Sequence, residues 1–183
     1  MKQSKYLRFN TPGEAHGISF TCFHNLKFLN NDRTRNYLVE SINRAKEVHM
    51  FDVWAYVIMP EHVHLVIFPS EEEYSISEIL KGIKVPVAKR SIAYLRKCRS
   101  GILKFMETGL MKPQYRFWQD GGGYDRNMID YKELVNLVDY IHNNPVQRGL
   151  CESSVDWFWS SARDWELGID GPIKINKETF PFS

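Results

Sequence analysis

The sequence predicts an α+β domain in which one antiparallel sheet carries helices on one of its faces. Two observations lead to this class. Short runs rich in β-branched and aromatic residues alternate along the chain with longer segments of helical periodicity. Two of the β-rich runs are separated only by a tight turn, which favours antiparallel pairing. A chain of 183 residues, 43% of them hydrophobic, is long enough to bury the core of one such domain.

The first part of the chain predicts a strand followed by an amphipathic helix. Residues 17–23, GISFTCF, are rich in strand formers. From 33 to 48, apolar residues recur at spacings of four and three among charged residues, which is the helical pattern. These apolar residues are Leu38, Ile42 and Ala45. Asn31 or Asp32 can cap this helix, because a side-chain oxygen at that place accepts a bond from a free backbone N–H.

The middle of the chain predicts a β-hairpin and then a long helix. Residues 51–59 and 63–68 are β-rich and are joined by a short turn, so we expect them to pair antiparallel. Residues 75–97 show helical spacing, with Ser75 and Ser77 as possible caps. Pro86 lies inside this helix and is a possible kink.

The last third predicts a short strand and a final helix. We expect a fourth strand near 115–119, before the glycine turn at 121–123. A strong helix opens at Asp130 or Tyr131, and Pro145 is expected to end it. Its apolar positions are Leu134, Leu137, Val138 and Ile141.

This order of elements is that of a ferredoxin-like (RRM-like) sandwich, whose second sheet face is expected to be free for a site. The tail carries four aromatic residues that we expect to pack back on the core: Trp157, Phe158, Trp159 and Trp165. Residues 1–183 are therefore interpreted as one domain, with a core of about 6–150 and a C-terminal extension at 151–183.

Composition excludes several classes of protein. A net charge of only +2 means that any nucleic-acid site must be a local patch. Cys22, Cys98 and Cys151 lie far apart, which argues against a disulfide framework and against a thiolate zinc site. The chain begins without an apolar leader, and its longest apolar run is too short to cross a bilayer. A cytoplasmic protein without a membrane partner is expected.

His62 and His64 flank one residue at the start of a predicted strand. Because side chains alternate along a strand, both imidazoles leave the same face of the sheet. Neutral imidazole is a common metal ligand, so the pair is half of a metal site. Two polar residues at the end of a turn would give the same pattern, and the pair alone does not decide between these interpretations.

Tyr140 and Asn144 are four residues apart on the final helix and therefore lie on adjacent turns of one face. On a helical wheel both fall at the edge of the apolar stripe, where they can look into a site between helix and sheet. A boundary aromatic and a polar residue near the helix end are the structural alternative.

Together these segments resemble a known family. WAYVIMPEHVHLVI resembles the HUH motif of the single-tyrosine transposases, and LVDYIHNNPVQRGL, followed by WFWSSA, is similar to the tyrosine helix of their REP-associated branch. The similarity runs from Tyr6 to Ala162 and includes the FWQ and YDR segments at 117–126. It implies a nuclease and strand transferase that acts on single-stranded DNA through a 5′-phosphotyrosine intermediate, in transposition or in the processing of repeat hairpins.

The resemblance also implies roles for individual residues. Tyr140 would be the nucleophile, and His62, His64 and Asn144 would bind a divalent metal ion. Magnesium prefers oxygen ligands, and the histidine pair makes manganese a second candidate. The expected partner is single-stranded DNA with hairpin ends, and the expected state is a monomer or a homodimer. We expect the DNA-binding residues to include Lys84, Lys89, Arg90, Arg116 and Arg126.

Three alternatives remain at this stage, and a fourth is excluded. Tyr124 also matches a family position and is a rival nucleophile. The chain could be a replication initiator or a relaxase, which uses the same chemistry, or a non-catalytic DNA-binding remnant of a transposase. A two-histidine phosphoesterase would need a second His-x-Ser/Thr motif, which the sequence lacks. The remaining histidines are expected to be structural or exposed, although His24 could lie near the site: His16, His24, His49 and His142.

Overall fold

The computed structural model describes residues 9–121 and 123–181. Tyr6, where the family resemblance begins, and Gly122 of the glycine turn lie outside the described residues. Within them one sheet has the strand order β2-β3-β1-β4, and every neighbouring pair is antiparallel. The strands are β1 (Ala15–Thr21), β2 (Phe51–Ile58), β3 (His62–Pro69) and β4 (Tyr124–Met128).

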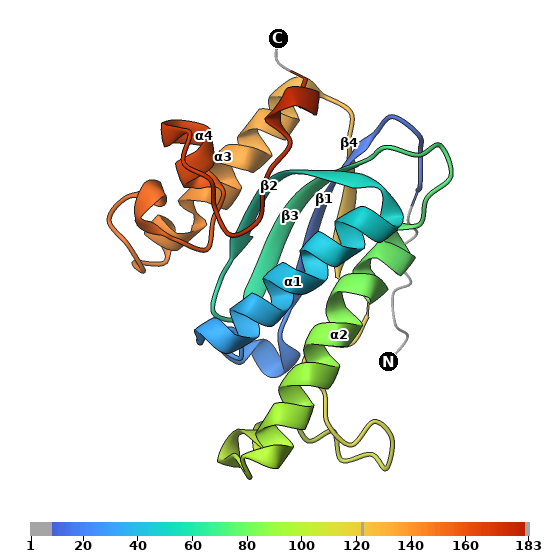
Figure 1. Cartoon of the computed structure of the whole chain (residues 1–183), viewed down its shortest axis with the longest axis vertical. Helices are drawn as coiled ribbons and strands as arrows, with labels where there is room; N and C mark the ends of the chain where they lie inside the picture. Colours follow the sequence, from blue (N-terminus) through green and yellow to red (C-terminus); the bar gives the residue numbers. More distant parts are fainter. Residues whose placement is uncertain (1–8, 122, 182–183) are drawn as a thin grey trace.

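Two long helices, α1 (Asp32–His49) and α2 (Ile76–Lys97), lie side by side across one face of the sheet (Figure 1). Together with alternate side chains of β1, β2 and β3 they enclose the larger part of the core. This arrangement of strands and helices is the predicted ferredoxin-like sandwich, and the fold class is confirmed. Short 3-10 helices lie in the connections: η1 (Phe23–Asn25), η2 (Gly101–Met106), η3 (Ser154–Asp156) and η4 (Lys177–Thr179).

The long helices begin at capping side chains. The Asn31 side chain accepts a hydrogen bond from the Thr34 N–H at 3.0 Å, as one of the two predicted caps of α1. Ser75 caps α2 in the same way. Asp130 caps α3 (Tyr131–Gln147) by accepting from the Glu133 N–H at 2.9 Å. Each cap satisfies a backbone donor that the first helical turn leaves free, so these starts could be predicted from local sequence.

The second face of the sheet, which the sequence analysis expected to be free, is partly covered by α3. Leu134, Val138 and Ile141 of this helix are buried against alternate residues of β2, including Ala55 and Val57. The sandwich therefore has three layers at this place, with α3 on the opposite side of the sheet from α1 and α2 (Figure 1). An apolar helical stripe must be buried, and the open face of the sheet is where it finds partners.

The C-terminal segment packs back on the core, as predicted, but Phe158, one of the four aromatic residues expected to pack there, is 52% exposed. The segment runs along β2, where the Ile58 N–H donates to the Trp159 carbonyl at 2.8 Å. The short helix α4 (Ala162–Leu167) follows, and Figure 1 shows it beside α3. Further on, the Phe180 ring meets the ring of Trp54 at 5.2 Å. The segment therefore covers the outer edge of the sheet at β2.

The predicted fourth strand at 115–119 is wrong, because β4 begins at Tyr124, five residues after the end of the predicted strand. Phe117 and Trp118 are buried, and this segment pairs with the first strand's end only through an isolated bridge between Cys22 and Trp118. The aromatic character that suggested a strand therefore comes from burial of single side chains in a loop. Strand formers are also core formers, and their composition alone does not separate the two.

The predicted helix end at Pro145 is also wrong, because α3 continues to Gln147. Proline lacks an N–H and removes one helical hydrogen bond, but the last turn is closed by other donors. The Arg148 N–H donates to the Asn144 carbonyl at 3.1 Å, and the Leu150 N–H donates to the Pro145 carbonyl at 2.9 Å. The chain then leaves the helix at Gly149, whose φ is 64°. α2 likewise runs as one helix through Pro86.

Gly123 lets β4 approach β1, and we predict that substituting it lowers the free energy of unfolding. Its φ is 80°, and a Cβ at this position would lie 2.3 Å from the Ser19 carbonyl oxygen. Gly121 has a φ of 91°, but no atom lies within 4 Å of its Cβ position. Gly121→Ala should therefore lower the free energy of unfolding by about 1 kcal/mol, through backbone strain alone. Gly123→Ala should cost about 1–3 kcal/mol more, because backbone atoms must move.

Urea unfolding of the two variants measures this difference. Gly121→Ala is the matched control, since it has the same change in side chain and a similar backbone conformation. An equal loss of stability in both variants would contradict the close approach of Gly123 to β1.

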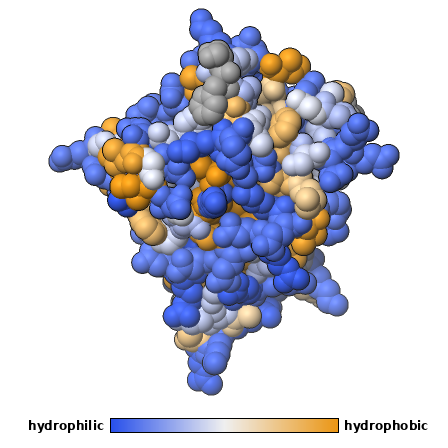
Figure 2. All heavy atoms as spheres, turned by 45° about the horizontal axis from the view of Figure 1, so that its top comes forward, coloured by the Kyte–Doolittle hydropathy of each residue, from blue (hydrophilic) through white to orange (hydrophobic). Residues whose placement is uncertain are grey.

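The described residues contain no helix that could span a membrane. None of their helices combines the length and the apolar composition that a bilayer crossing requires. Figure 2 shows that hydrophilic side chains dominate the face drawn and that apolar side chains form small, separate areas on it.

Candidate active site

The two predicted metal-binding histidines converge on one face of the sheet. His62 and His64 open β3, where they lie opposite Thr21 and Ser19 of β1. Their ring centroids are 4.9 Å apart. Val63 between them points to the other face and belongs to the core under α1 and α2. Strand alternation thus places both imidazoles on the side of the sheet that α3 covers.

Burial keeps both imidazoles neutral at neutral pH. Burial, together with a smaller effect of the neighbouring His62, lowers the pKa of His64 from 6.5 to about 4. Burial also lowers the pKa of His62, while the adjacent Glu61 carboxylate acts in the opposite direction. A neutral imidazole has a free nitrogen lone pair, which is the form that binds a metal ion.

Tyr140 lies over this histidine pair. It sits on α3, its side chain is 47% exposed, and its ring centroid is 5.7 Å from that of His64. The helical wheel predicted a position at the edge of the apolar stripe, and Tyr140 occupies it next to the buried Ile141. The phenol and the paired imidazoles are far apart in the sequence. They nevertheless lie close together within one chain.

Asn144 is buried, and its side-chain oxygen Oδ1 has no hydrogen-bond partner among the described residues. It lies one helical turn after Tyr140 and one turn before Arg148. Tyr140 contacts His64, and Arg148 pairs with Glu61 beside His62. The amide between these two helical positions therefore faces the part of β3 that carries the imidazoles. A buried acceptor without a partner is costly unless a ligand satisfies it.

Glu61 and Arg148 form an ion pair that the sequence analysis missed. Glu61 Oε1 lies 3.1 Å from His62 Nδ1 and 2.9 Å from Arg148 Nη2. The carboxylate is buried and can only accept, so Nδ1 donates to it and Nε2 of His62 stays free. Such a bond orients an imidazole toward a metal ion. The sequence held two signals for this pair: Glu61 directly precedes His62, and Arg148 continues the four-residue spacing of Tyr140 and Asn144.

The donors at this place fit a divalent cation. Imidazole nitrogen is a borderline ligand and amide oxygen is a hard one, and this mixture suits Mn²⁺ and tolerates Mg²⁺. Among the described residues, no three His, Cys, Asp or Glu side chains come together as a metal site. A cation held by the two imidazoles would therefore need a donor of another type, and the unpartnered Asn144 Oδ1 is a candidate.

The rival tyrosine, Tyr124, lies farther from the histidine pair. It is 52% exposed on β4 and pairs with Ser19 of β1, whereas His64 is on β3, on the other side of β1. Two strand spacings separate the backbones of Tyr124 and His64, which is roughly 10 Å. The structure brings Tyr140, and not Tyr124, into ring contact with an imidazole.

Of the five predicted DNA-binding residues, Arg126 alone lines the pocket that contains Tyr140 and His64. It pairs with Glu133 of α3 at 2.7 Å, and both side chains are about half exposed. Three others, Lys84, Lys89 and Arg90, belong to α2 on the opposite face of the sheet. The fifth, Arg116, pairs with its near neighbour in the loop before β4. The five residues therefore do not form one patch.

The basic residues of α2 have partners of their own. Lys84 donates to the Gly121 carbonyl at 3.0 Å and so ties α2 to the glycine turn. Arg90 pairs with Glu40, and its guanidinium lies 4.0 Å from the centre of the Tyr37 ring. Both residues thus help to hold the helical layer, and their prediction as DNA contacts stays untested.

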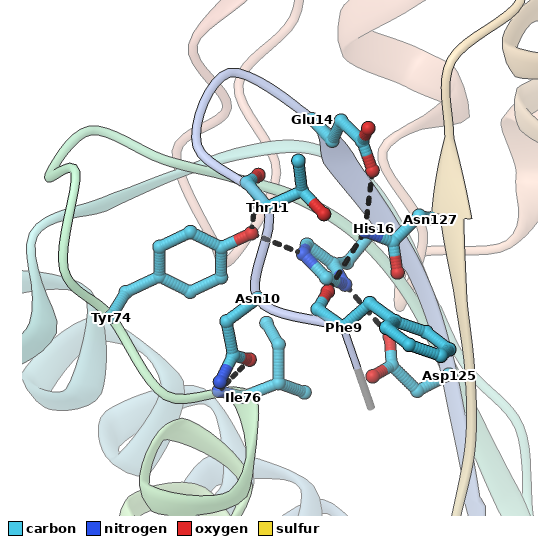
Figure 3. Close-up of polar contacts among 9 residues, drawn as sticks. All are labelled: Phe9, Asn10, Thr11, Glu14, His16, Tyr74, Ile76, Asp125 and Asn127. Carbon is cyan, nitrogen blue, oxygen red and sulfur yellow. Dashed lines mark hydrogen bonds and ion pairs between the residues drawn. The ribbon is translucent and has the colours of Figure 1, made fainter. Parts of the chain in front are cut away.

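The other histidines are structural or exposed, as the sequence analysis expected. His16 is buried on the face of the sheet that α2 covers. Its Nδ1 lies 2.9 Å from Asp125 Oδ1, and its Nε2 lies 2.8 Å from the Tyr74 hydroxyl (Figure 3). His142 is also buried, and its Nε2 lies 2.8 Å from the Ser161 hydroxyl. Although it is close to Tyr140 in sequence, it faces the C-terminal segment. His24 is exposed, and its ring packs on Phe23.

Comparison with known proteins agrees with this geometry. Residues 16–144 match the family described as Transposase IS200 like. A REP-associated tyrosine transposase of Haemophilus influenzae is 30% identical over 137 residues, which cover 71% of this chain and 73% of the relative. One of Escherichia coli K12 is 28% identical over 133 residues, 72% of this chain and 67% of the relative.

A solved structure of a REP-associated tyrosine transposase bound to a REP hairpin has the same fold. Its TM-score is 0.68 at 23% identity, and the match covers 99% of this chain and 96% of that one. The family match spans both the histidine pair and Tyr140. The chain belongs to the IS200-like transposase family and, within it, to the REP-associated tyrosine transposases.

Proposed function

We propose that the protein cuts and rejoins single-stranded DNA beside hairpins, with Tyr140 as the nucleophile and a divalent metal ion held by His62, His64 and Asn144. The observation that supports this most directly is the ring contact between Tyr140 and His64. Packing alone does not account for a half-exposed phenol beside two neutral imidazoles and an unpartnered amide oxygen.

The proposed reaction is a substitution at phosphorus. The Tyr140 oxygen bonds to the scissile phosphate as the bond from phosphorus to the 3′ oxygen breaks, so the DNA 5′ end becomes joined to the protein. The phenol proton passes to solvent, and the leaving 3′ oxygen takes up a proton from solvent. A phenol is mostly protonated at neutral pH, so the attack needs an electrophile that is already polarised. A divalent ion held by His62, His64 and Asn144 would supply that polarisation by drawing charge from the phosphate.

The covalent intermediate makes the reaction reversible. The phosphotyrosine bond keeps the free energy of the broken phosphodiester, so a second 3′ hydroxyl can attack it and restore a DNA strand. No nucleotide cofactor is required for this exchange. The exposure of Tyr140 fits the role, because a strand of DNA must reach the phenol oxygen from solvent.

The active site is proposed to be complete within one chain, which supports a monomer. Tyr140 contacts His64 of its own chain, and Arg148 of the same helix pairs with Glu61 of the same hairpin. Two contacts along α3 thus hold it in register over β3. The DNA partner is inferred from the relative whose structure contains a REP hairpin.

The experiment that tests the proposed function is a covalent trapping assay. Purified protein is mixed with a labelled hairpin that carries a single-stranded extension, together with Mn²⁺ or Mg²⁺. We expect a labelled protein band that persists in denaturing electrophoresis and that does not form when EDTA is present from the start of the reaction. Binding of the hairpin in a gel-shift assay without any covalent band, under all metal conditions, would instead favour a non-catalytic DNA-binding remnant.

Glu61→Gln should weaken metal binding without loss of the fold. The neutral amide accepts a weaker hydrogen bond from His62 Nδ1 and no longer pairs with Arg148, which lies 2.9 Å away. Loss of such an orienting partner typically lowers metal affinity by about 10–100-fold. Isothermal titration with Mn²⁺ measures this change. Glu72→Gln is the matched control, since it removes the same charge from an exposed loop. Unchanged Mn²⁺ affinity in Glu61→Gln would show that Glu61 does not orient His62.

A further inference from the structure

A pocket of about 380 Å³ lies beside Tyr140, between α3 and the strands β1 and β4. Its volume is within the range of small-molecule sites, which runs from about 300 to 1,000 Å³. Tyr140 and His64 form one end of its lining. The other residues that line the pocket take no part in the proposed cleavage chemistry.

The walls of this pocket are apolar in their deeper part. Met128 and Ile141 are buried, and Leu137 is partly buried, and all three line it. Gly17 lines it without a side chain, and a Cβ there would lie 2.5 Å from Leu137 Cδ2. The Leu137 side chain therefore packs directly on the backbone of β1 at this point and forms part of the apolar wall. Apolar walls favour a ligand with a large uncharged surface.

The rim is polar and aromatic. Tyr124 presents a ring that is 52% exposed, and Asn136 presents an exposed amide that can both donate and accept hydrogen bonds. Arg126 and Glu133 form their ion pair at the same rim. A planar heterocycle with hydrogen-bonding edges matches this combination, because unpaired bases stack on aromatic rings and pair with amides. A duplex does not, since its bases are already paired and stacked.

Most of the pocket and the proposed metal ligand Asn144 lie on opposite sides of the phenol along α3, and His64 lines the end of the pocket beside Tyr140. Glu133, Asn136 and Leu137 are one and two turns before Tyr140, whereas Asn144 is one turn after it. In an in-line substitution the leaving 3′ oxygen departs opposite the attacking Tyr140 oxygen. The nucleoside on that oxygen therefore points away from α3. The nucleoside joined through the 5′ oxygen leaves phosphorus sideways and can lie along the helix.

We propose, on the basis of the proposed cleavage function, that this pocket binds the unpaired base on the 3′ side of the scissile phosphate. This is the base of the nucleotide that stays joined to Tyr140 after cleavage. Its ring stacks against Tyr124, its edge meets Asn136, and Arg126 exchanges Glu133 for the phosphate that follows. The pocket thereby holds the covalent DNA end in place while a second 3′ hydroxyl approaches.

Substrates with one missing base test this proposal. The trapping assay is run with an intact strand, with an abasic site at the nucleotide 3′ of the cut, and with an abasic site at the nucleotide 5′ of the cut. We expect the 3′ abasic site to lower the rate of adduct formation by about tenfold to a hundredfold, the range for loss of one stacked base, and more than the 5′ abasic site does. Equal rates with all three substrates would overturn the pocket proposal while leaving the cleavage function intact.

A binding measurement keeps the proposal testable even if no cleavage occurs. The base on the 3′ side is replaced by the fluorescent analogue 2-aminopurine, and Tyr140→Phe protein is added without metal. Stacking on Tyr124 should quench the fluorescence, Tyr124→Phe should retain the quenching, and Tyr124→Ala should lose most of it. The same label at the 5′ side should respond less. Quenching that is equal at both positions, or that persists in Tyr124→Ala, would overturn the proposal.

Discussion

Tyr140→Phe should abolish the covalent protein–DNA band in the trapping assay, with a loss of rate on the order of 10⁴-fold or more. The variant lacks the only oxygen that the proposed mechanism joins to phosphorus. Its fold should be retained, because the side chain is 47% exposed and the substitution keeps the ring that contacts His64. Thermal unfolding and hairpin binding in a gel shift, both compared with the parent protein, verify that only the chemistry is lost.

Tyr131→Phe is the matched control for this result. Tyr131 is on the same helix and is 38% exposed, but its ring faces Phe180 in the C-terminal segment. The Tyr131→Phe protein should form the adduct at the rate of the parent protein. The rival nucleophile is tested by Tyr124→Phe, which should still form an adduct that tryptic mapping places on Tyr140. A band that survives in Tyr140→Phe and disappears in Tyr124→Phe would reverse the assignment.

The second large effect is expected from His64→Ala. The substitution removes one of the two neutral imidazoles, whose ring centroids lie 4.9 Å apart, and this is the ring that Tyr140 contacts. Loss of metal-assisted charge stabilisation is worth several kcal/mol, so the rate of adduct formation should fall by about 10³-fold or more. Titration calorimetry should show that Mn²⁺ binding is weakened in parallel.

Removal of the metal should reproduce this loss in the parent protein. EDTA should suppress the adduct, and an excess of Mn²⁺ should restore it, whereas the same excess should not rescue His64→Ala. His49→Ala, at the end of α1 on the other side of the sheet, is a control for the loss of one imidazole. Parent-level Mn²⁺ affinity in His64→Ala, with the adduct still absent, would mean that His64 acts on the tyrosine and not on a metal ion.

Several parts of this site could be predicted from the sequence because they depend on local rules. Strand alternation put His62 and His64 on one face, and the helical period put Tyr140 beside the apolar stripe. Asn31, Ser75 and Asp130 cap their helices because the first turn of any helix leaves backbone donors free. These features are set by neighbours within about one turn or one strand, so the surrounding structure does not change them.

Other parts could not be predicted, because long-range contacts decide them. The position of β4 depends on the close approach of Gly123 to Ser19, and on the burial of Phe117 in the preceding loop. Composition gives both segments a similar character, and only the finished core separates them. The continuation of α3 beyond Pro145 likewise depends on hydrogen bonds that close its last turn.

The sequence by itself determined the fold class, the shared face of the two imidazoles and the one-turn spacing of Tyr140 and Asn144, since backbone periodicity dictates all three. Only the tertiary structure decided that α3 covers the second sheet face and that Arg148 meets Glu61. It also decided that a pocket opens on one side of the phenol. These results depend on which apolar surfaces bury each other, and that choice involves residues far apart along the chain.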